Sequence, residues 1–181
     1  MPATKRLQDR EEKRDELVTA ARRLFIEDGY EATSMAKLAQ TAGVAGNTIY
    51  WYFADKDDVL VAVLNAVMTD VWSEYQDVAA QPFEERLLWA VGQLRQMRRL
   101  VTTVHARIGQ SAALNEWHDS FHLLAEGLLR SALQQTGAAG SSLDAEVKIG
   151  VFTIEGLLTH ELDVEQQAAI CRRLAMHATQ G

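Results

Sequence analysis

The chain has 181 residues, of which 48% are hydrophobic, one is cysteine and two are proline. A chain of this length buries about two-thirds of its unfolded surface, so it needs no metal or disulfide to fold, and the lone Cys171 forms no disulfide framework. No stretch approaches the roughly 18 uncharged apolar residues of a membrane span, and residues 1–14 are charged where a secretory signal is apolar. We therefore expect a cytoplasmic protein without a membrane segment.

The net charge of −7 is distributed unevenly along the chain. Residues 1–53 carry eight basic and eight acidic side chains, whereas residues 54–181 carry ten basic and seventeen acidic ones. An acidic chain, taken as a whole, argues against a protein coated for nucleic acid. Because the excess acid lies outside the first 53 residues, the net charge does not exclude a nucleic-acid site within them.

Apolar residues recur at spacings of three and four through most of the chain, and no alternating pattern predicts a strand. Average usage would give about nine prolines instead of two, so little interrupts a helix. We therefore predict an all-α fold of about nine helices.

Three short helical segments are predicted near the N-terminus. The stripe from Leu17 to Phe25 predicts a helix that Gly29 ends. Thr33 or Ser34 then offers a hydroxyl N-cap for a helix over 35–41, in which Leu38 and Ala39 face inward. After a tight turn at 42–44, the aromatic-rich segment 45–52 has too few apolar positions to be buried on all sides, so it must expose one face.

The remaining two-thirds of the chain predicts longer helices. The first runs from Lys56 toward Ala80 and stops or restarts at Pro82. Further helical segments follow over 83–100, 101–114, 115–135, 143–161 and 163–179, with a Gly-rich loop over 136–142.

The three N-terminal segments and their turn around Gly43 predict a helix-turn-helix, whose second helix enters the major groove of DNA. Hydroxyls at a helix N-terminus, Thr33 and Ser34, suit a phosphate. Asn47 can pair with an adenine edge and Thr48 can touch a thymine methyl or a phosphate. The full set of candidate DNA contacts is Thr33, Ser34, Gly46, Asn47, Thr48, Tyr50, Trp51, Tyr52 and Lys56.

Two alternatives stay open for this set. Tyr50 and Tyr52 can instead close the core of the small domain. A basic N-terminal arm, made of Lys5, Arg6, Arg10, Lys13 and Arg14, alternates with acidic residues and can be a solvated helix start rather than a DNA contact.

One run of residues matches a known pattern. Its parts are Leu24 to Ser34, Leu38-Ala39, Ala42-Gly43-Val44, Thr48-Ile49-Tyr50, Tyr52-Phe53 and Lys56. This run resembles the N-terminal domain of TetR-family transcriptional regulators over roughly residues 14–64. The remaining two-thirds matches that family only in its number of helices and in ending with a helix pair.

The resemblance implies a DNA-binding domain over 1–54 and a ligand-binding and dimerisation domain over 55–181. It also implies a homodimer through the last two helices, at 143–179, and a repressor that a small-molecule effector releases from a palindromic operator. Residue by residue, it places Ser34, Asn47, Thr48, Tyr50, Tyr52 and Lys56 at DNA-contact positions and Phe25, Leu38 and Phe53 in the core. Ala45 departs from the pattern, because a Ser or Thr usually caps the recognition helix there, and Asn47 replaces a small residue.

Large apolar side chains of the second domain are candidates for an effector pocket, since such cavities favour aromatics. Ordinary core packing explains the same pattern. The candidates are Met68, Trp72, Tyr75, Trp89, Met97, Trp117 and Phe121.

Arginines concentrate in a stretch, 86–115, that contains no acidic residue. An anionic effector would explain Arg86, Arg95, Arg98, Arg99 and Arg107, but we favour a solvated face that pairs with acids elsewhere. The mid-helix residues Gly150 and Gly156 indicate close helix approach, which we assign to a dimer contact with packing inside the chain as the alternative.

His118 and His122 lie one helical turn apart, with Glu126 one turn further, and this spacing can chelate a metal. Because no second His or Cys cluster supports a site, we predict no metal and no cofactor. Cys171 lies on an apolar stripe and is expected in the core or an interface.

Enzyme motifs are absent from the sequence, which has no phosphate loop and no nucleophile elbow. We therefore predict a regulator and not an enzyme. The alternatives are an activator or co-regulator of the same fold, and a helical small-molecule-binding enzyme whose helix-turn-helix does not bind DNA.

Overall fold

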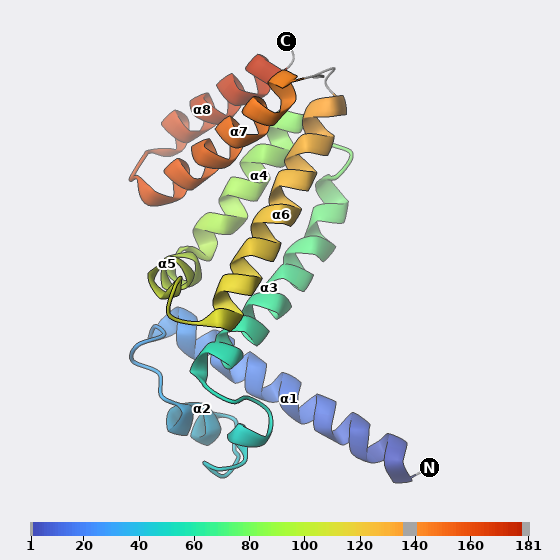
Figure 1. Cartoon of the computed structure of the whole chain (residues 1–181), viewed down its shortest axis with the longest axis vertical. Helices are drawn as coiled ribbons and strands as arrows, with labels where there is room; N and C mark the ends of the chain where they lie inside the picture. Colours follow the sequence, from blue (N-terminus) through green and yellow to red (C-terminus); the bar gives the residue numbers. More distant parts are fainter. Residues whose placement is uncertain (1, 136–140, 179–181) are drawn as a thin grey trace. The chain divides into compact units, whose positions relative to one another are not determined.

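The computed structural model describes residues 2–135 and 141–178, and all secondary-structure elements within these ranges are helices (Figure 1). This confirms the all-α fold; the described residues form eight α-helices and one 3₁₀-helix, where the sequence predicted about nine helices. Residues 136–140, which belong to the predicted Gly-rich loop, lie outside the described residues. The elements are α1 Pro2–Glu27, α2 Met35–Thr41, the 3₁₀-helix η1 Ile49–Trp51, α3 Lys56–Val78, α4 Phe83–Gln96, α5 Arg98–Arg107, α6 Ala112–Gln135, α7 Ser141–Thr159 and α8 Val164–Ala178.

The chain packs as two compact units. Unit 1 comprises residues 1–71 and 99–117, and unit 2 comprises residues 72–98 and 118–181. These are divisions of packing; the functional division between residues 54 and 55 stays a prediction. No helix of the described residues is long and apolar enough to cross a membrane.

Unit 1 begins as the sequence predicts. Gly29 adopts a φ of +93° after α1, where its N–H bonds the carbonyl of Leu24 at 3.1 Å, and Gly43 adopts a φ of +67° in the turn after α2. Only glycine tolerates this region without strain. The Ser34 hydroxyl caps α2 by accepting from the Lys37 N–H at 3.2 Å, and both Leu38 and Ala39 are buried as expected.

The segment expected to form a helix over 45–52 is shorter and tighter than predicted. Only residues 49–51 are helical, as the 3₁₀-helix η1. The Thr48 N–H bonds the carbonyl of Ala45 at 2.8 Å, and no side chain caps the segment. Alanine at position 45 has no oxygen to satisfy the first N–H groups of an α-helix, which accounts for the weak start.

Unit 2 is held together by two apolar clusters. One joins α6 to α7 through Leu129, Leu133, Leu143, Val147 and Val151. The other joins α4, α7 and α8 through Leu87, Val91, Leu157, Cys171 and Leu174. Cys171 is therefore a core residue, and burial raises the pKa of its thiol.

Gly150 corrects one interpretation of the sequence. A Cβ added there would meet Cδ2 of Leu129 at 2.4 Å, so the glycine allows α7 to approach α6 within one chain rather than across a dimer. A Cβ at Gly156 would meet nothing within 4 Å in this chain, so its assignment to a dimer contact stays a prediction.

The helix boundaries between residues 83 and 114 differ from those predicted. The break falls at Met97, where α4 ends, rather than near residue 100. Apolar spacing continues through this point, so periodicity alone could not locate the break.

Candidate nucleic-acid interface

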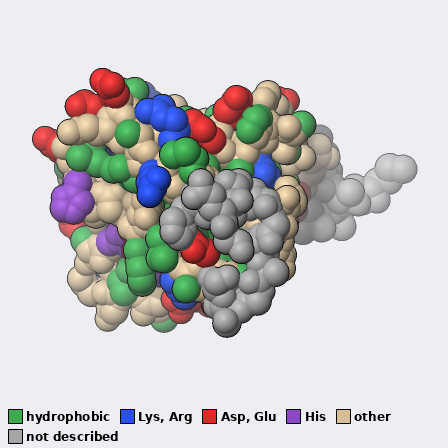
Figure 2. All heavy atoms as spheres, turned by 90° about the horizontal axis from the view of Figure 1, so that it is seen from above, with side chains coloured by type: hydrophobic (Ala, Val, Ile, Leu, Met, Phe, Trp, Pro, Cys, Tyr) green, Lys and Arg blue, Asp and Glu red, His purple; other side chains and the backbone are tan. Residues whose placement is uncertain are grey.

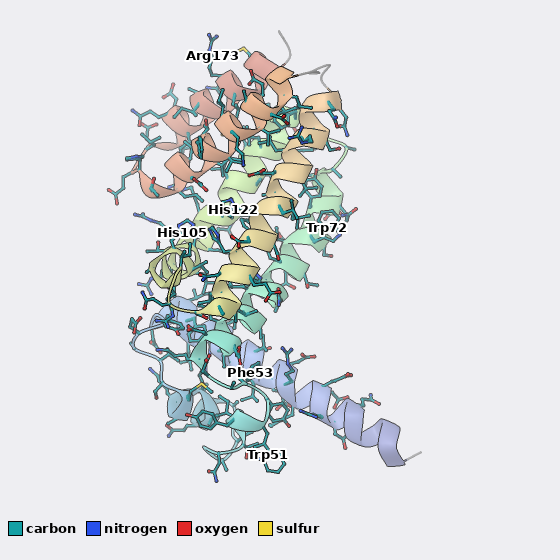
Figure 3. All side chains as sticks on the ribbon, viewed as in Figure 1. Trp51, Phe53, Trp72, His105, His122 and Arg173 are labelled. Atoms are coloured by element: carbon teal, nitrogen blue, oxygen red, sulfur yellow. The ribbon has the colours of Figure 1, made fainter. Side chains whose placement is uncertain are left out.

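The segment after the Gly43 turn exposes one face and anchors the other. Ile49 and Phe53 are buried, whereas 57% of Tyr50 and 80% of Trp51 are exposed. Trp51 and Phe53 are labelled in Figure 3. Tryptophan side chains are mostly buried on average, so a tryptophan this exposed indicates a surface that binds another molecule. Gly46 and Asn47 are also exposed, and Thr48 and Tyr52 are half-buried.

Helix α1 supports this segment from behind. Arg10 donates to the carbonyl of Trp51 at 3.4 Å and lies 6.0 Å from the centre of the Tyr52 ring. Lys13 donates to the carbonyl of Ala42 at 3.4 Å, at the end of α2. The expected arm is therefore the start of a helix, and the described basic residues of it hold the interface in place. The side chains of Lys5 and Arg6 lie outside the described residues.

The two hydroxyls at the start of α2 have different roles. Ser34 is exposed and caps the helix. Thr33 is 0% exposed, and its hydroxyl donates to the carbonyl of Gly29 at 2.8 Å. Thr33 is therefore a structural residue of the loop, and its prediction as a phosphate contact is wrong because its side chain does not reach the surface.

Lys56 is half-buried against Tyr30. Its Nζ donates to the Tyr30 carbonyl at 2.9 Å and lies 4.0 Å from the centre of the Tyr30 ring. An ammonium has three N–H donors, so Lys56 keeps donors for a phosphate while its side chain is held in one orientation.

Beneath Lys56 lies a buried polar network that the sequence analysis missed. Asp57 accepts from Nε of Arg107 at 2.6 Å and from Nη2 at 2.8 Å, and it also accepts from the hydroxyl of Tyr30. Burial by itself would raise the pKa of Asp57, but the hydrogen bonds from Arg107 and Tyr30 hold it below its usual value. Burial and the hydrogen bond to Asp57 raise the pKa of Tyr30, which stays a donor.

Two sequence signals could have revealed this network. Asp57 lies one turn before the buried Leu60, so it is an acid on the inward face of a helix. Arg107 comes from the stretch without acids, and such an arginine needs a distant partner. The network fixes α5 to the N-terminus of α3 within unit 1.

The other arginines of that stretch also have protein partners. Arg99 of unit 1 donates to the carbonyls of Ile26 and Glu27 at 2.8 and 2.7 Å, at the C-terminus of α1. In unit 2, Arg95 donates to Gln167 and Arg98 lies 3.9 Å from Glu161. Among the five arginines, Arg98 and Arg107 pair with acidic side chains in the described part of the chain. The expectation that these arginines pair with acids elsewhere therefore holds for two of them.

The candidate pocket residues divide between the units. Met68 and Trp117 belong to unit 1, while Trp72, Tyr75, Trp89, Met97 and Phe121 belong to unit 2. In unit 2 the Tyr75 ring lies 5.7 Å from both the Trp72 and the Trp89 ring. Arg86 donates to the Tyr75 hydroxyl at 3.3 Å, and its buried Nε has no hydrogen-bond partner within the described part of the chain.

Comparisons with known proteins connect this geometry to a family. The sequence model described as "Bacterial regulatory proteins, tetR family" matches residues 17–63. The chain is 43% identical over 58 residues to the HTH-type transcriptional regulator HbdR of Aromatoleum sp. (strain CIB), which covers 32% of this chain and 25% of that protein. It is 27% identical over 99 residues to the HTH-type transcriptional repressor KstR2 of Rhodococcus jostii (strain RHA1), covering 55% and 45% of the two chains.

The likeness of the fold extends further than that of the sequence. The transcriptional regulator FadR of Bacillus subtilis, solved in complex with stearoyl-CoA, superimposes with a TM-score of 0.62 at 19% identity, covering 92% of this chain and 97% of that one. By contrast, the matched sequence spans less than half of HbdR or KstR2. These relatives are named as regulators of transcription and not as enzymes.

Proposed function

We propose, from the premise that this chain belongs to the tetR family of bacterial regulatory proteins, that it represses transcription by binding a palindromic DNA operator as a homodimer. The observation that carries the proposal is the exposed face around Trp51 and Asn47, fixed on the buried Ile49 and Phe53. Two copies would read half-sites in successive major grooves. We place the DNA-binding domain at 1–54 and the ligand-binding and dimerisation domain at 55–181, in a cytoplasmic protein.

Each exposed side chain has a chemical role in this proposal. Asn47 reads a base edge, because its amide can bond an adenine at two atoms. Ser34 and Lys56 bind phosphates, and Thr48 binds a phosphate or a thymine methyl. The proposed contact set is Ser34, Gly46, Asn47, Thr48, Tyr50, Trp51, Tyr52 and Lys56.

A selection from random DNA sequences tests the operator. We expect a palindromic motif, and a Kd that rises steeply with salt because phosphate contacts release counterions. Asn47→Ala should remove the preference at one base in each half-site, by about tenfold or more. A selection that returns no palindrome at low salt contradicts the proposal.

Charge reversal tests the placement of the interface. Lys56→Glu should weaken operator binding at least about tenfold, because it puts a negative charge against a phosphate. Arg98→Glu is the matched control, since Arg98 is an exposed cation of unit 2. Equal losses from both substitutions would mean that binding depends on net charge and not on this face.

We propose that a small-molecule effector binds among the aromatic residues of the second domain, around Tyr75 and Trp89. FadR of B. subtilis was solved with stearoyl-CoA. A ligand of this kind combines a large apolar part, which would suit the aromatic side chains, with hydrogen-bond acceptors. Such an acceptor suits Nε of Arg86, which is buried without a partner among the described residues. The other proposed lining residues, all of unit 2, are Trp72, Met97 and Phe121.

The effector would release the operator by a population shift. In one form of the dimer the spacing of the two DNA-binding domains does not match the operator. A ligand that binds this form more tightly than the DNA-bound form lowers operator affinity, and the operator lowers ligand affinity by the same factor. A screen of metabolites for a rise in Tm identifies the ligand, and titration of that ligand should raise the operator Kd. An unchanged operator Kd would refute this mechanism.

We propose the last two helices, residues 143–179, as the dimer interface. On α7, Ile149 and Phe152 are 49% and 66% exposed, and Gly156 continues the same face one turn on. On α8, Met176 is 47% exposed. Hydrophobic side chains also reach the surface among charged ones in the view of Figure 2. Exposed apolar groups of this size indicate an interaction surface.

Analytical ultracentrifugation tests this interface. Phe152→Asp should weaken the dimer at least about tenfold, because it buries a charge in an apolar contact. Leu123→Asp is the control, since Leu123 is 76% exposed but lies on α6. A dimer that Leu123→Asp disrupts and Phe152→Asp does not would place the interface elsewhere.

Two other functions are distinguished by direct measurements. An activator or co-regulator of the same fold would raise transcription of a reporter when the protein is supplied. An enzyme with a structural helix-turn-helix would turn over a small molecule and show no salt-sensitive DNA binding. The relatives' names favour regulation over catalysis.

A further inference from the structure

Unit 2 brings three metal-ligating side chains together on two neighbouring helices. His118 and His122 lie one turn apart on α6, and Glu155 lies on α7 (Figure 3 labels His122). The two helices are fixed against each other by the cluster around Leu129 and by the close approach at Gly150. The three side chains are therefore presented from a rigid pair of helices.

The two histidines lie close to each other, and Glu155 lies close to His122. One ring nitrogen of His118 and one of His122 lie within 4.8 Å of each other, and the ring centroids are 4.3 Å apart. Nε2 of His122 lies 3.7 Å from Oε1 of Glu155. Ligand atoms at about 2.0–2.2 Å from a tetrahedral Zn²⁺ are roughly 3.3–3.6 Å apart. Glu155 lies against His122, and a change of its rotamer would be needed to bring its carboxylate onto the ion held by the two histidines.

The carboxylate that completes the set is not the one the sequence suggests. Spacing along the helix points to Glu126, but Glu126 is paired with Lys148 of α7. Glu155 is the acid that faces His122, and 39% of its side-chain surface is exposed, which leaves room for its carboxylate to rotate toward an ion.

The surroundings also suit an imidazole ligand. Nδ1 of His118 lies 3.8 Å from a carboxylate oxygen of Asp119, and metal-bound histidines commonly direct their second nitrogen at such a carboxylate.

We propose that His118, His122 and Glu155 bind one divalent transition-metal ion of the Zn²⁺ type, with a remaining position for water or another ligand. Two imidazoles and one carboxylate favour Zn²⁺, Co²⁺ or Ni²⁺ over Mg²⁺ and Ca²⁺, which prefer oxygen donors. The ion would cross-link α6 and α7. This site revises the expectation from sequence that the chain binds no metal.

Calorimetric titration of the full chain with Zn²⁺ alone, without an affinity tag or DNA, tests the site. We expect one ion per chain, no competition from excess Mg²⁺, and a visible absorption band when Co²⁺ replaces Zn²⁺. His118→Ala and His122→Ala should each weaken binding at least about tenfold. His160→Ala is the matched control, since His160 is exposed at the end of α7, and it should bind as the unmodified chain does.

A second pair of variants keeps the test decisive if a histidine variant fails to fold. Glu155→Gln should weaken Zn²⁺ binding, whereas Glu126→Gln should not, and both change a single carboxylate to an amide. Unchanged Zn²⁺ affinity in His122→Ala, or a loss in Glu126→Gln with none in Glu155→Gln, overturns the proposal. Because DNA is absent from the assay, its outcome is separate from that of the proposed operator binding.

Discussion

The two units of this protein solve the problem of holding helices together in different ways. Unit 1 buries the carboxylate of Asp57 against the half-buried guanidinium of Arg107, beneath the proposed DNA-binding face. Unit 2 relies on two apolar clusters, and its buried polar side chain, Gln167, is a neutral amide that donates to the carbonyl of Leu162 at 2.8 Å. Among the described residues, the ion pairs Arg130–Asp144 and Lys148–Glu126 of unit 2 lie at its surface.

The difference lies in the polar groups, because both units bury apolar side chains. In unit 1, α3 contributes Val59, Leu60 and Val63 to the core, and the contact of Arg107 with Asp57 adds a charged link between α5 and the start of α3. A buried ion pair contributes little net stability, but it penalises every arrangement in which it is broken. In unit 2 the two clusters that join the helices are apolar, so packing specifies their arrangement without a charged link of this kind.

The largest effect is expected from breaking the buried pair. Asp57→Ala should destabilise unit 1 by about 3 kcal/mol or more, because it leaves the Arg107 guanidinium without its partner. Urea denaturation with hydrogen exchange of unit 1 peptides measures the loss. Asp70→Ala, which removes the exposed pair between Arg22 and Asp70, should cost less than about 1 kcal/mol. Equal losses would mean that the Asp57–Arg107 pair contributes no more to the stability of unit 1 than an exposed pair does.

Helix packing in unit 2 offers the corresponding test. Gly150→Ala should destabilise the protein by about 1 kcal/mol, since its Cβ would overlap Leu129. Gly156→Ala, with no atom of this chain near its Cβ, should gain about 0.5–1 kcal/mol from helix propensity. Thermal unfolding at a fixed protein concentration compares the two. A gain in both variants would show that α6 and α7 are not tightly packed at Gly150.

The pH dependence of stability should also separate the units. The pKa of Asp57 is lowered in the folded state, so its contribution is present above the unfolded value of about 3.9 and is lost as pH falls through the lower folded value. Unfolding measured between about pH 6 and pH 3 should be less steep in Asp57→Asn. An unaltered profile would mean that other carboxylates govern acid unfolding.

The smallest effect concerns the cap of α2. Ser34→Ala should cost about 1 kcal/mol, because the Lys37 N–H loses its acceptor. Ser34→Asp keeps a capping oxygen and should retain stability, but its charge should repel a phosphate and weaken DNA binding. Comparing unfolding and operator affinity in both variants separates the two roles of Ser34. Full DNA affinity in Ser34→Asp would remove this residue from the proposed contacts.

Local chemistry made much of unit 1 predictable from sequence. Gly29 and Gly43 punctuate the helices because few other residues adopt a positive φ, and Ser34 begins α2 because it supplies the missing acceptor. The family pattern placed Asn47, Tyr50 and Lys56 in one segment. Periodicity likewise located the long helices, although it missed the break at Met97, where the apolar stripe continues across the boundary.

What the sequence by itself determined is the all-helical fold and the identity of the helix-turn-helix, since these follow from spacing within a few residues. Tertiary structure decided which polar groups meet across long separations. It buried Thr33, paired Asp57 with Arg107 fifty residues away, and set Glu155 rather than Glu126 against His122. Helical periodicity gives the face of each side chain, but only the packing of helices determines the partner on the facing element.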